Sequence, residues 1–210
     1  MIAILASQNQ GKIKEFNSIL EKYDFSLISR NDAGLPRDDV EENGTTFEEN
    51  SLIKAQAIRN MIIECGFEQY KDCPILADDS GLMVDVLDGA PGVFSARYAG
   101  EDNNATANNN KLLSELRDVP EEKRKAHFVT VITMLYPDGS IIVARGECHG
   151  TIATELRGED GFGYDPVFIP DGFDGKTFSE LGTDFKNSIS HRARALEDLE
   201  KHLTATTGQT

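Results

Sequence analysis

Hydrophobic residues follow two different periods along the chain, and each period predicts one kind of element. Residues 1–6 are almost continuously apolar, which predicts a buried strand at the start of the chain. The polar residues 7–11 form a loop, and the apolar residues after it recur at helical spacing: Ile13, Phe16, Ile19 and Leu20. The chain is therefore expected to begin with a strand, a loop and a helix.

Three further helices are predicted from capping residues and apolar stripes. Thr46 and Glu49 match a capping box at the start of a helix that continues to about Cys65. A second helix covers about 106–119, and the last covers about 188–203. The core side of these helices is formed by Leu52, Ala55 and Ile62, then by Leu112, Leu113 and Leu116, and finally by Ala195, Leu196, Leu199 and Leu203.

The stretch PILADDSGL, residues 74–82, places two adjacent acids between two apolar runs. We interpret 75–77 and 82–87 as two short strands, so that Asp78 and Asp79 follow the carboxyl end of the first, where α/β proteins bind ligands. Two neighbouring carboxylates repel each other unless a cation lies near them, and a divalent cation with oxygen ligands is the usual solution. A simple turn is the alternative interpretation.

Another pair of strands is predicted further along the chain. Residues 126–136 and 140–148 are rich in β-branched and apolar residues and flank the turn sequence PDG. Together with the helices, these segments predict an α/β protein.

Composition and charge exclude several classes of partner. The 210 residues, of which 39% are hydrophobic, predict one domain at 1–203 and a disordered tail at 204–210. The net charge of -15 and the pI near 4.6 argue against nonspecific binding to nucleic acid and to anionic membranes. The cysteines form no CxxC pair, no apolar run could span a membrane, and the apolar start is too short for a signal peptide. We expect a soluble cytoplasmic protein.

The stretch ASQNQGKIKE, residues 6–15, has the features of an anion site. Backbone N–H groups at a helix start can hold an anion, and Lys12 and Lys14 stand where basic residues oppose the helix dipole unless an anion is bound. It is not a Walker loop, because Ala6 and Ile13 stand where that motif needs Gly and Ser or Thr. A solvated, lysine-bearing surface is the alternative.

Two later stretches suit the recognition of a flat ring. In GFGYDPVF, residues 161–168, Phe162 lies between glycines and presents a poorly shielded aromatic face. In SHRARAL, His191 and Arg192 occupy the first turn of the last helix, where an electronegative partner would suit them. The alternatives are a core aromatic beside a tight turn and an exposed helix start.

Acidic residues also gather in DDVEENGTTFEEN, residues 38–50. Such a loop is often simply solvated, but Glu41 or Glu42 could complete a magnesium site begun by the Asp pair. Taken together, lysines for phosphates, carboxylates for Mg²⁺ and an aromatic ring with donors for a base describe a site for a nucleoside triphosphate.

Six stretches in this order resemble the inosine triphosphate pyrophosphatase family: ASQNQGKIKE, TFEENSLIKA, LADDSGL, GAPGVFSARYAG, GFGYDPVF and SISHRARAL. The resemblance extends from Ile2 to about Leu203, and it departs from many relatives at Ser7, where Thr is common. It implies an elongated, two-lobed α/β fold with a long mixed central sheet flanked by helices, an active site in the cleft between the lobes, and a homodimer.

The resemblance also implies roles for individual residues. Asp79 would be the catalytic proton acceptor and, with Glu41, would bind Mg²⁺; Glu42 and Asp78 are weaker metal candidates. The substrate would be bound by Ser7, Gln8, Asn9, Gln10, Gly11, Lys12, Lys54 and Ser80 and, at the base, by Phe162, Gly163, Tyr164, Asp165, Lys186, His191 and Arg192.

The implied reaction is hydrolysis of ITP, dITP or XTP to the nucleoside monophosphate and pyrophosphate, which would cleanse the nucleotide pool. Donors near His191 and Arg192 suit the six-keto oxygen of a deaminated purine and would clash with an adenine amino group. The sequence does not explain how guanine is rejected. A phosphatase that releases orthophosphate and a nucleotide-binding module without turnover are the alternatives.

Overall fold

The computed structural model of the chain describes residues 1–7, 13, 16–17, 20–36, 40–100 and 104–207. The strands are β1 (Ile2–Leu5), β2 (Ser26–Ser29), β3 (Ile75–Val84), β4 (Lys125–Leu135), β5 (Ile141–Ile152) and β6 (Phe168–Pro170), and the helices are α2 (Phe47–Glu64), α3 (Ala105–Glu115), α4 (Phe178–Leu181), α5 (Thr183–Ile189) and α6 (His191–Thr207). Short 3₁₀ turns lie at Glu21–Tyr23, Glu68–Tyr70, Asp85–Leu87, Gly92–Arg97 and Glu121–Lys123.

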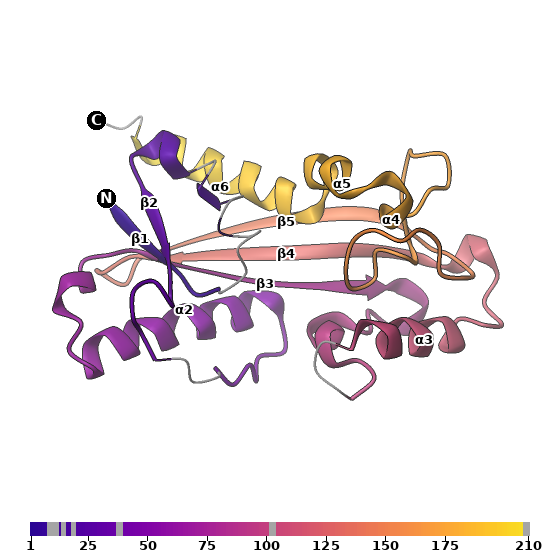
Figure 1. Cartoon of the computed structure of the whole chain (residues 1–210), viewed down its shortest axis with the longest axis horizontal. Helices are drawn as coiled ribbons and strands as arrows, with labels where there is room; N and C mark the ends of the chain where they lie inside the picture. Colours follow the sequence, from indigo (N-terminus) through magenta and orange to yellow (C-terminus); the bar gives the residue numbers. More distant parts are fainter. Residues whose placement is uncertain (8–12, 14–15, 18–19, 37–39, 101–103, 208–210) are drawn as a thin grey trace. The chain divides into compact units, whose positions relative to one another are not determined.

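The strands form one mixed sheet in the order β2-β1-β3-β4-β5-β6, of which Figure 1 labels β1 to β5. β1 is parallel to both β2 and β3, whereas β5 and β6 are antiparallel. The α/β class and the mixed sheet flanked by helices, which the sequence predicted, are therefore confirmed. The elongated shape and the cleft between lobes stay predictions.

The chain divides into two compact units. The first unit contains Met1–Asp79, Val131–Arg145 and Ala195–Thr210, and the second contains Ser80–Thr130 and Gly146–Arg194. The chain passes from one unit to the other inside β3, between Asp79 and Ser80, and again inside β4, β5 and α6. Whether the units act as one domain stays a prediction.

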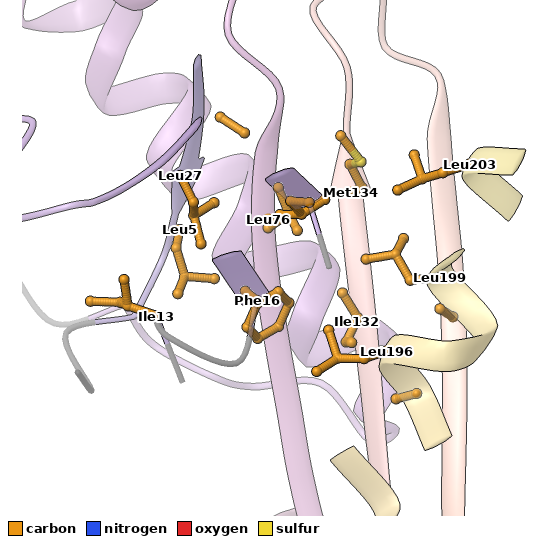
Figure 2. Close-up of a cluster of buried hydrophobic side chains, with 14 residues drawn as sticks. Leu5, Ile13, Phe16, Leu27, Leu76, Ile132, Met134, Leu196, Leu199 and Leu203 are labelled. Carbon is orange, nitrogen blue, oxygen red and sulfur yellow. The ribbon is translucent and has the colours of Figure 1, made fainter. Parts of the chain in front are cut away.

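The first unit has a hydrophobic core on each face of its part of the sheet. On one face, Leu196 and Leu199 of α6 pack with Phe16, Leu76 and Ile132 (Figure 2). On the other face, α2 contributes Ala55, Ile58 and Ile62 to a core that also holds Ile75 and Ala77 of β3. The predicted stripe of α6 is confirmed, because Ala195, Leu196, Leu199 and Leu203 are all buried.

The second unit has its own core around β3, β4 and β6. Leu82, Phe128 and Phe168 pack there with two leucines of the α3 region. Leu112 lies on the buried side of α3, and Leu116 is the residue at which the helix ends. The rings of Phe128 and Phe168 meet edge to face, with centroids 4.7 Å apart. This core supports the residues that line the pocket described below.

The structure corrects the prediction for residues 75–87. They do not form two strands with an acidic turn between them, because β3 is continuous from Ile75 to Val84 and Asp85–Leu87 is a 3₁₀ turn. Asp78 and Asp79 are therefore buried in the middle of a strand. The physical reason is that the charge of Asp79 is met by a lysine from another element.

The end of the last helix also differs from the prediction. α6 continues to Thr207, so residues 204–207 form its final turn rather than part of a tail. Residues 208–210 lie outside the described part of the chain. Among the described residues, no helix has the length and apolarity that a membrane span requires.

Candidate active site

Asp79 faces helix α2 because side chains alternate along β3. Ala77 belongs to the core under α2, and Leu76 belongs to the core under α6. Residues two apart lie on the same face of a strand, so Asp79 projects toward α2 and Asp78 toward the opposite face. The two adjacent acids therefore do not act as one pair of carboxylates, which corrects the interpretation that their mutual repulsion calls for a divalent cation near both.

Lys54 of α2 supplies the positive charge that Asp79 needs. Its ammonium lies 2.8 Å from Asp79 Oδ1 and 2.8 Å from Glu42 Oε2. It also donates a hydrogen bond of 3.1 Å to the carbonyl oxygen of Asp78. Lys54 thus joins the loop before α2 to the middle of β3.

The environment shifts the pKa of both partners upward. Burial raises the pKa of Asp79 above its ordinary value, Lys54 opposes this increase, and the nearby charge of Glu42 adds to it. Burial alone would lower the pKa of Lys54, but the charges and hydrogen bonds of Asp79 and Glu42 raise it above its ordinary value. Lys54 therefore stays charged, while Asp79 holds a proton to higher pH than an exposed aspartate does.

The loop before α2 is fixed by hydrogen bonds at the start of the helix. The predicted capping box is confirmed: Thr46 accepts from the backbone N–H of Glu49, and the Glu49 carboxylate accepts from that of Thr46. Asn50 Oδ1 accepts from the backbone N–H of Gly44 at 2.9 Å, and a Cβ on Gly44 would lie 2.6 Å from that oxygen. Glycine is therefore required there for the loop that carries Glu42 to approach α2.

The oxygen atoms around Asp79 suit a hard divalent cation. Asp79 Oδ2 is buried and makes no hydrogen bond of normal geometry among the described residues, although the side chain of Asn50 lies close enough to lower the pKa of Asp79. In the part of the chain that is described, no three or more Asp, Glu, His or Cys side chains converge as a metal site. Mg²⁺ is commonly held by only one or two carboxylates together with substrate phosphates, so the residues present fit this ion.

The two candidate acids of the loop differ in position. Among the described residues, Glu42 rather than Glu41 contacts Lys54, and Glu41 is exposed. The structure therefore brings Glu42 to the Asp79–Lys54 pair, whereas the sequence had favoured Glu41. Ser7 is described and lies two residues beyond β1, but Gln8, Asn9, Gln10, Gly11 and Lys12 lie outside the described residues.

Replacing Lys54 with methionine should destabilise the metal-free protein increasingly as the pH rises. In the wild type, the charge of Lys54 keeps the pKa of Asp79 from rising as far as burial alone would raise it. Without that charge, the pKa of Asp79 in the folded variant is higher still, and its carboxyl group binds a proton more tightly. A carboxyl group whose pKa is raised on folding contributes stability at low pH and loses it as the pH passes its folded pKa.

Melting temperatures of Lys54→Met and wild type from acid to mildly alkaline pH measure this effect. Lys22→Met is the matched control, because Lys22 makes an ion pair with Glu200 that is largely exposed and is worth at most about 1 kcal/mol. A deficit in melting temperature that shrinks as the pH rises would contradict the role assigned to Lys54.

The second unit contains a pocket of about 380 Å³. Eight residues singled out in the sequence line it: Ser80, Phe162, Gly163, Tyr164, Asp165, Lys186, His191 and Arg192. They come from β3, from the loop before β6, from α5 and from the start of α6. Residues up to 112 positions apart in the sequence thus line the same pocket. The volume of this pocket is in the range of small-molecule binding sites.

Phe162 is held over a buried ion pair. Lys186 Nζ lies 2.6 Å from Asp165 Oδ2, and both side chains are almost fully buried. The same ammonium lies 3.9 Å from the centre of the Phe162 ring, and the ring itself is 63% exposed. An aromatic face and a cation therefore border the pocket side by side.

The backbone of this loop depends on Gly161. Gly161 has a φ of 92°, and a Cβ there would lie 2.4 Å from Asp165 Oδ2. That oxygen also accepts from the backbone N–H of Phe162 at 2.9 Å. Glycine therefore lets the loop close tightly around the Asp165 carboxylate.

The first turn of α6 brings two more cationic or donor side chains to the pocket. The Ser190 hydroxyl accepts from the backbone N–H of Ala193 at 3.2 Å, which caps the helix. The ring of His191 stacks on Phe128 of β4, with centroids 4.7 Å apart and planes 12° from parallel. This packing fixes the orientation of His191, and Arg192 follows it directly in the chain.

Sequence reasoning missed several residues that shape this pocket. Phe128, Ser95 and Asn108 line it, and Asn109 donates a hydrogen bond of 2.7 Å to the carbonyl oxygen of Gly163. The Tyr164 hydroxyl donates to Ser95 O at 2.8 Å. The motif GAPGVFSARYAG contained Ser95, but the run of asparagines in α3 carried no signal beyond its polarity.

The comparisons with known proteins cover nearly the whole chain. The model of the Ham1 family matches residues 3–202. A dITP/XTP pyrophosphatase from Clostridium perfringens is 50% identical over 200 residues, which are 95% of this chain and 96% of the relative. A dITP/XTP pyrophosphatase from Geobacter sulfurreducens is 47% identical over 201 residues, which are 95% of each chain.

Solved structures are similar over the same length. The Ham1 protein of Staphylococcus aureus is 40% identical and has a TM-score of 0.86, covering 98% of this chain and 100% of that one. A nucleoside-triphosphatase / dITP/XTP pyrophosphatase from Mycobacterium abscessus is 39% identical and has a TM-score of 0.76, covering 95% and 97%.

Proposed function

This chain belongs to the Ham1 family, and we propose that it hydrolyses the deaminated purine nucleotides ITP, dITP and XTP to the monophosphate and pyrophosphate. The family resemblance stated from the sequence motifs is confirmed by the family match and by the relatives of 41–50% identity. The names of the relatives as dITP/XTP pyrophosphatases support the substrate class.

The observation that carries the proposal is the environment of Asp79. One oxygen of this buried carboxylate contacts Lys54, and the other makes no hydrogen bond of normal geometry among the described residues, with the side chain of Asn50 nearby. A buried carboxylate whose pKa is raised accepts a proton more readily than an exposed aspartate does.

In the proposed reaction, Asp79 takes a proton from a water molecule that attacks the α-phosphorus. A bond forms between the water oxygen and the α-phosphorus, and the bond from that phosphorus to the oxygen bridging to the β-phosphorus breaks. Pyrophosphate leaves with the electron pair. Lys54 adds positive charge next to the anionic triphosphate, and Ser7 to Lys12 bind its phosphates.

We propose Mg²⁺ as the cofactor, held by Asp79 with Glu41 or Glu42. The contact between Glu42 and Lys54 favours Glu42, and Asp78 is a weaker candidate because it projects from the opposite face of β3. When bound, Mg²⁺ neutralises the triphosphate and stabilises the charge that develops on the departing pyrophosphate.

The pocket of the second unit binds the purine base in this proposal. Phe162 offers a face for stacking, and Lys186, His191 and Arg192 offer N–H donors to a six-keto oxygen. An adenine amino group would face these donors without an acceptor, which disfavours ATP. Ser80, Gly163, Tyr164 and Asp165 complete the proposed contacts around the base.

Phe162→Ala should weaken the binding of ITP and GTP by similar factors. Stacking on an aromatic ring is worth ~1–3 kcal/mol per base and depends little on the base. The matched control is Phe185→Ala, because Phe185 is also exposed but does not line the pocket. Dissociation constants for both nucleotides measure the effect. If the ratio of the ITP and GTP dissociation constants changes by as large a factor as the constants themselves, the stacking role is contradicted.

A substrate panel tests the proposed function. ITP, XTP, dITP, GTP and ATP are offered with Mg²⁺, and pyrophosphate and orthophosphate are measured separately. The proposal predicts pyrophosphate from the first three and little product from GTP and ATP. Orthophosphate as the product would favour a phosphatase, and binding without any product would favour a nucleotide-binding module.

A homodimer and a cytoplasmic location are further parts of the proposal. The family resemblance implied the homodimer, and composition and cysteine usage implied the location; light scattering on the purified protein would test the first. A mass of one chain, 23.1 kDa, would contradict it.

A further inference from the structure

Two histidines lie directly opposite each other on neighbouring strands of the second unit. The backbone N–H of Ile152 in β5 donates to the carbonyl oxygen of Arg124, just before β4, at 2.9 Å. In an antiparallel pair, each step forward along β4 corresponds to one step backward along β5. Three steps from the pair of Arg124 and Ile152 therefore place His127 opposite His149. Hydrogen-bonded and non-hydrogen-bonded pairs alternate in such a ladder, so this is a non-hydrogen-bonded pair, whose side chains approach most closely.

The two rings have the separation that a shared metal ion requires. Their centroids are 5.3 Å apart, and their planes are tilted by 32°. An imidazole nitrogen lies ~2.0–2.1 Å from a bound zinc ion, and the ring centre lies roughly 1 Å further, so two imidazoles on one tetrahedral ion have centres about 5 Å apart. A modest rotation of the two side chains therefore suffices to direct a nitrogen of each toward one point.

Each ring also has a carboxylate near one of its nitrogens. His149 Nε2 lies 3.3 Å from Glu147 Oε2, within hydrogen-bond distance, and His127 Nδ1 lies 3.9 Å from Asp85 Oδ1, a distance that a small movement of the exposed Asp85 side chain would close. Histidines that ligate metals usually direct their second nitrogen to a carboxylate or carbonyl, which fixes the tautomer and makes the ligating nitrogen more basic. Here Nε2 of His127 and Nδ1 of His149 are the nitrogens left for an ion.

The position of the pair makes it accessible. The side chain of His149 is 60% exposed and that of His127 is 21% exposed. The next residue of β4, Phe128, points into the core, so His127 projects from the outer face of the sheet. Neither histidine lines the pocket.

We propose that His127 and His149 bind one Zn²⁺ ion, with water completing its coordination. Imidazole nitrogen suits Zn²⁺ and other late first-row divalent ions, whereas Mg²⁺ prefers oxygen. No set of three metal-binding side chains is present among the described residues, so the protein supplies two ligands. The ion joins β4 to β5, is separate from the proposed Mg²⁺ site, and therefore stabilises the folded chain without being needed for turnover.

Calorimetric titration with zinc chloride tests this site in excess magnesium chloride. The parent protein carries Cys65→Ser, because Cys65 is an exposed thiol that would bind zinc by itself. His127→Asn and His149→Asn each remove one ligand, and Glu147→Gln keeps both ligands but removes a supporting charge. His202→Asn is the matched control, because His202 also lies within 4 Å of a carboxylate, at 3.8 Å from Asp198, but faces no second histidine among the described residues.

The proposal predicts one zinc ion per chain in the parent and in His202→Asn. It predicts loss of saturable binding in both ligand variants and a dissociation constant about tenfold higher in Glu147→Gln. In the parent, NMR signals of the His127 and His149 rings shift together at one equivalent, and zinc raises the melting temperature. No saturable binding in the parent, unchanged binding in His149→Asn, or equal loss in His202→Asn would each overturn the proposal.

Discussion

Asp79→Asn is expected to abolish turnover while the folded protein stays at least as stable as the wild type. The amide has nearly the same shape but cannot accept the proton of the attacking water, and general acid–base catalysis contributes ~10²–10⁴-fold. It is also a poorer metal ligand, which adds to the loss. Stability does not fall, because the neutral amide avoids burying a charge and Lys54 keeps Glu42 as its partner.

The measurement pairs kcat for ITP with the melting temperature of the metal-free protein. Asp78→Asn is the matched control, because it changes the same group one residue earlier on the opposite face of β3. We expect it to lose less activity than Asp79→Asn. A folded Asp79→Asn enzyme with near-normal turnover would refute the catalytic assignment.

The second large effect is expected from Arg192→Ala, which should reduce kcat/KM for ITP much more than for ATP. A charge-assisted hydrogen bond is worth ~1.5–3 kcal/mol, which corresponds to roughly 10- to 150-fold. Only a base that presents an acceptor at the six-position can make this bond. Hydrolysis of ATP, which lacks that acceptor, should change little.

Arg194→Ala is the matched control for this prediction. Arg194 lies on the same helix two residues further on, but it donates to the carbonyl oxygen of Glu147 and does not line the pocket. The ratio of kcat/KM for ITP and ATP should be unchanged in that variant. If Arg192→Ala lowers kcat/KM by the same factor for both nucleotides, the arginine binds phosphate or ribose instead.

The sequence predicted helices better than it predicted β3, the strand that carries Asp79. The capping box at Thr46 and the apolar stripe of α6 are local signals, and both are confirmed. In β3, the residues Asp78, Asp79 and Ser80 interrupt the apolar pattern, and local rules favour a turn there. The strand continues because Lys54, 25 residues earlier in the chain, meets the charge of Asp79, and such a distant contact leaves no periodic signal.

The residues of the pocket were predicted more fully than the residues around Asp79. Phe162 and Arg192 were found through motifs and Lys186 through the family resemblance, and the structure gathers all three in one pocket. Phe128 and Asn109 were missed, because a core aromatic and a helical asparagine resemble many others until their contacts with His191 and Gly163 are known. Spacing could not separate Glu41 from Glu42, since the loop conformation decides which carboxylate reaches Lys54.

Hydrolysis of ITP in water enriched with ¹⁸O tests the central claim most directly. The proposed attack of water on the α-phosphorus places the heavy oxygen in the nucleoside monophosphate and leaves pyrophosphate unlabelled, which mass spectrometry of the two products resolves. Label in pyrophosphate or in orthophosphate, with an unlabelled nucleotide product, would show attack at another phosphorus and would contradict the proposed role of Asp79.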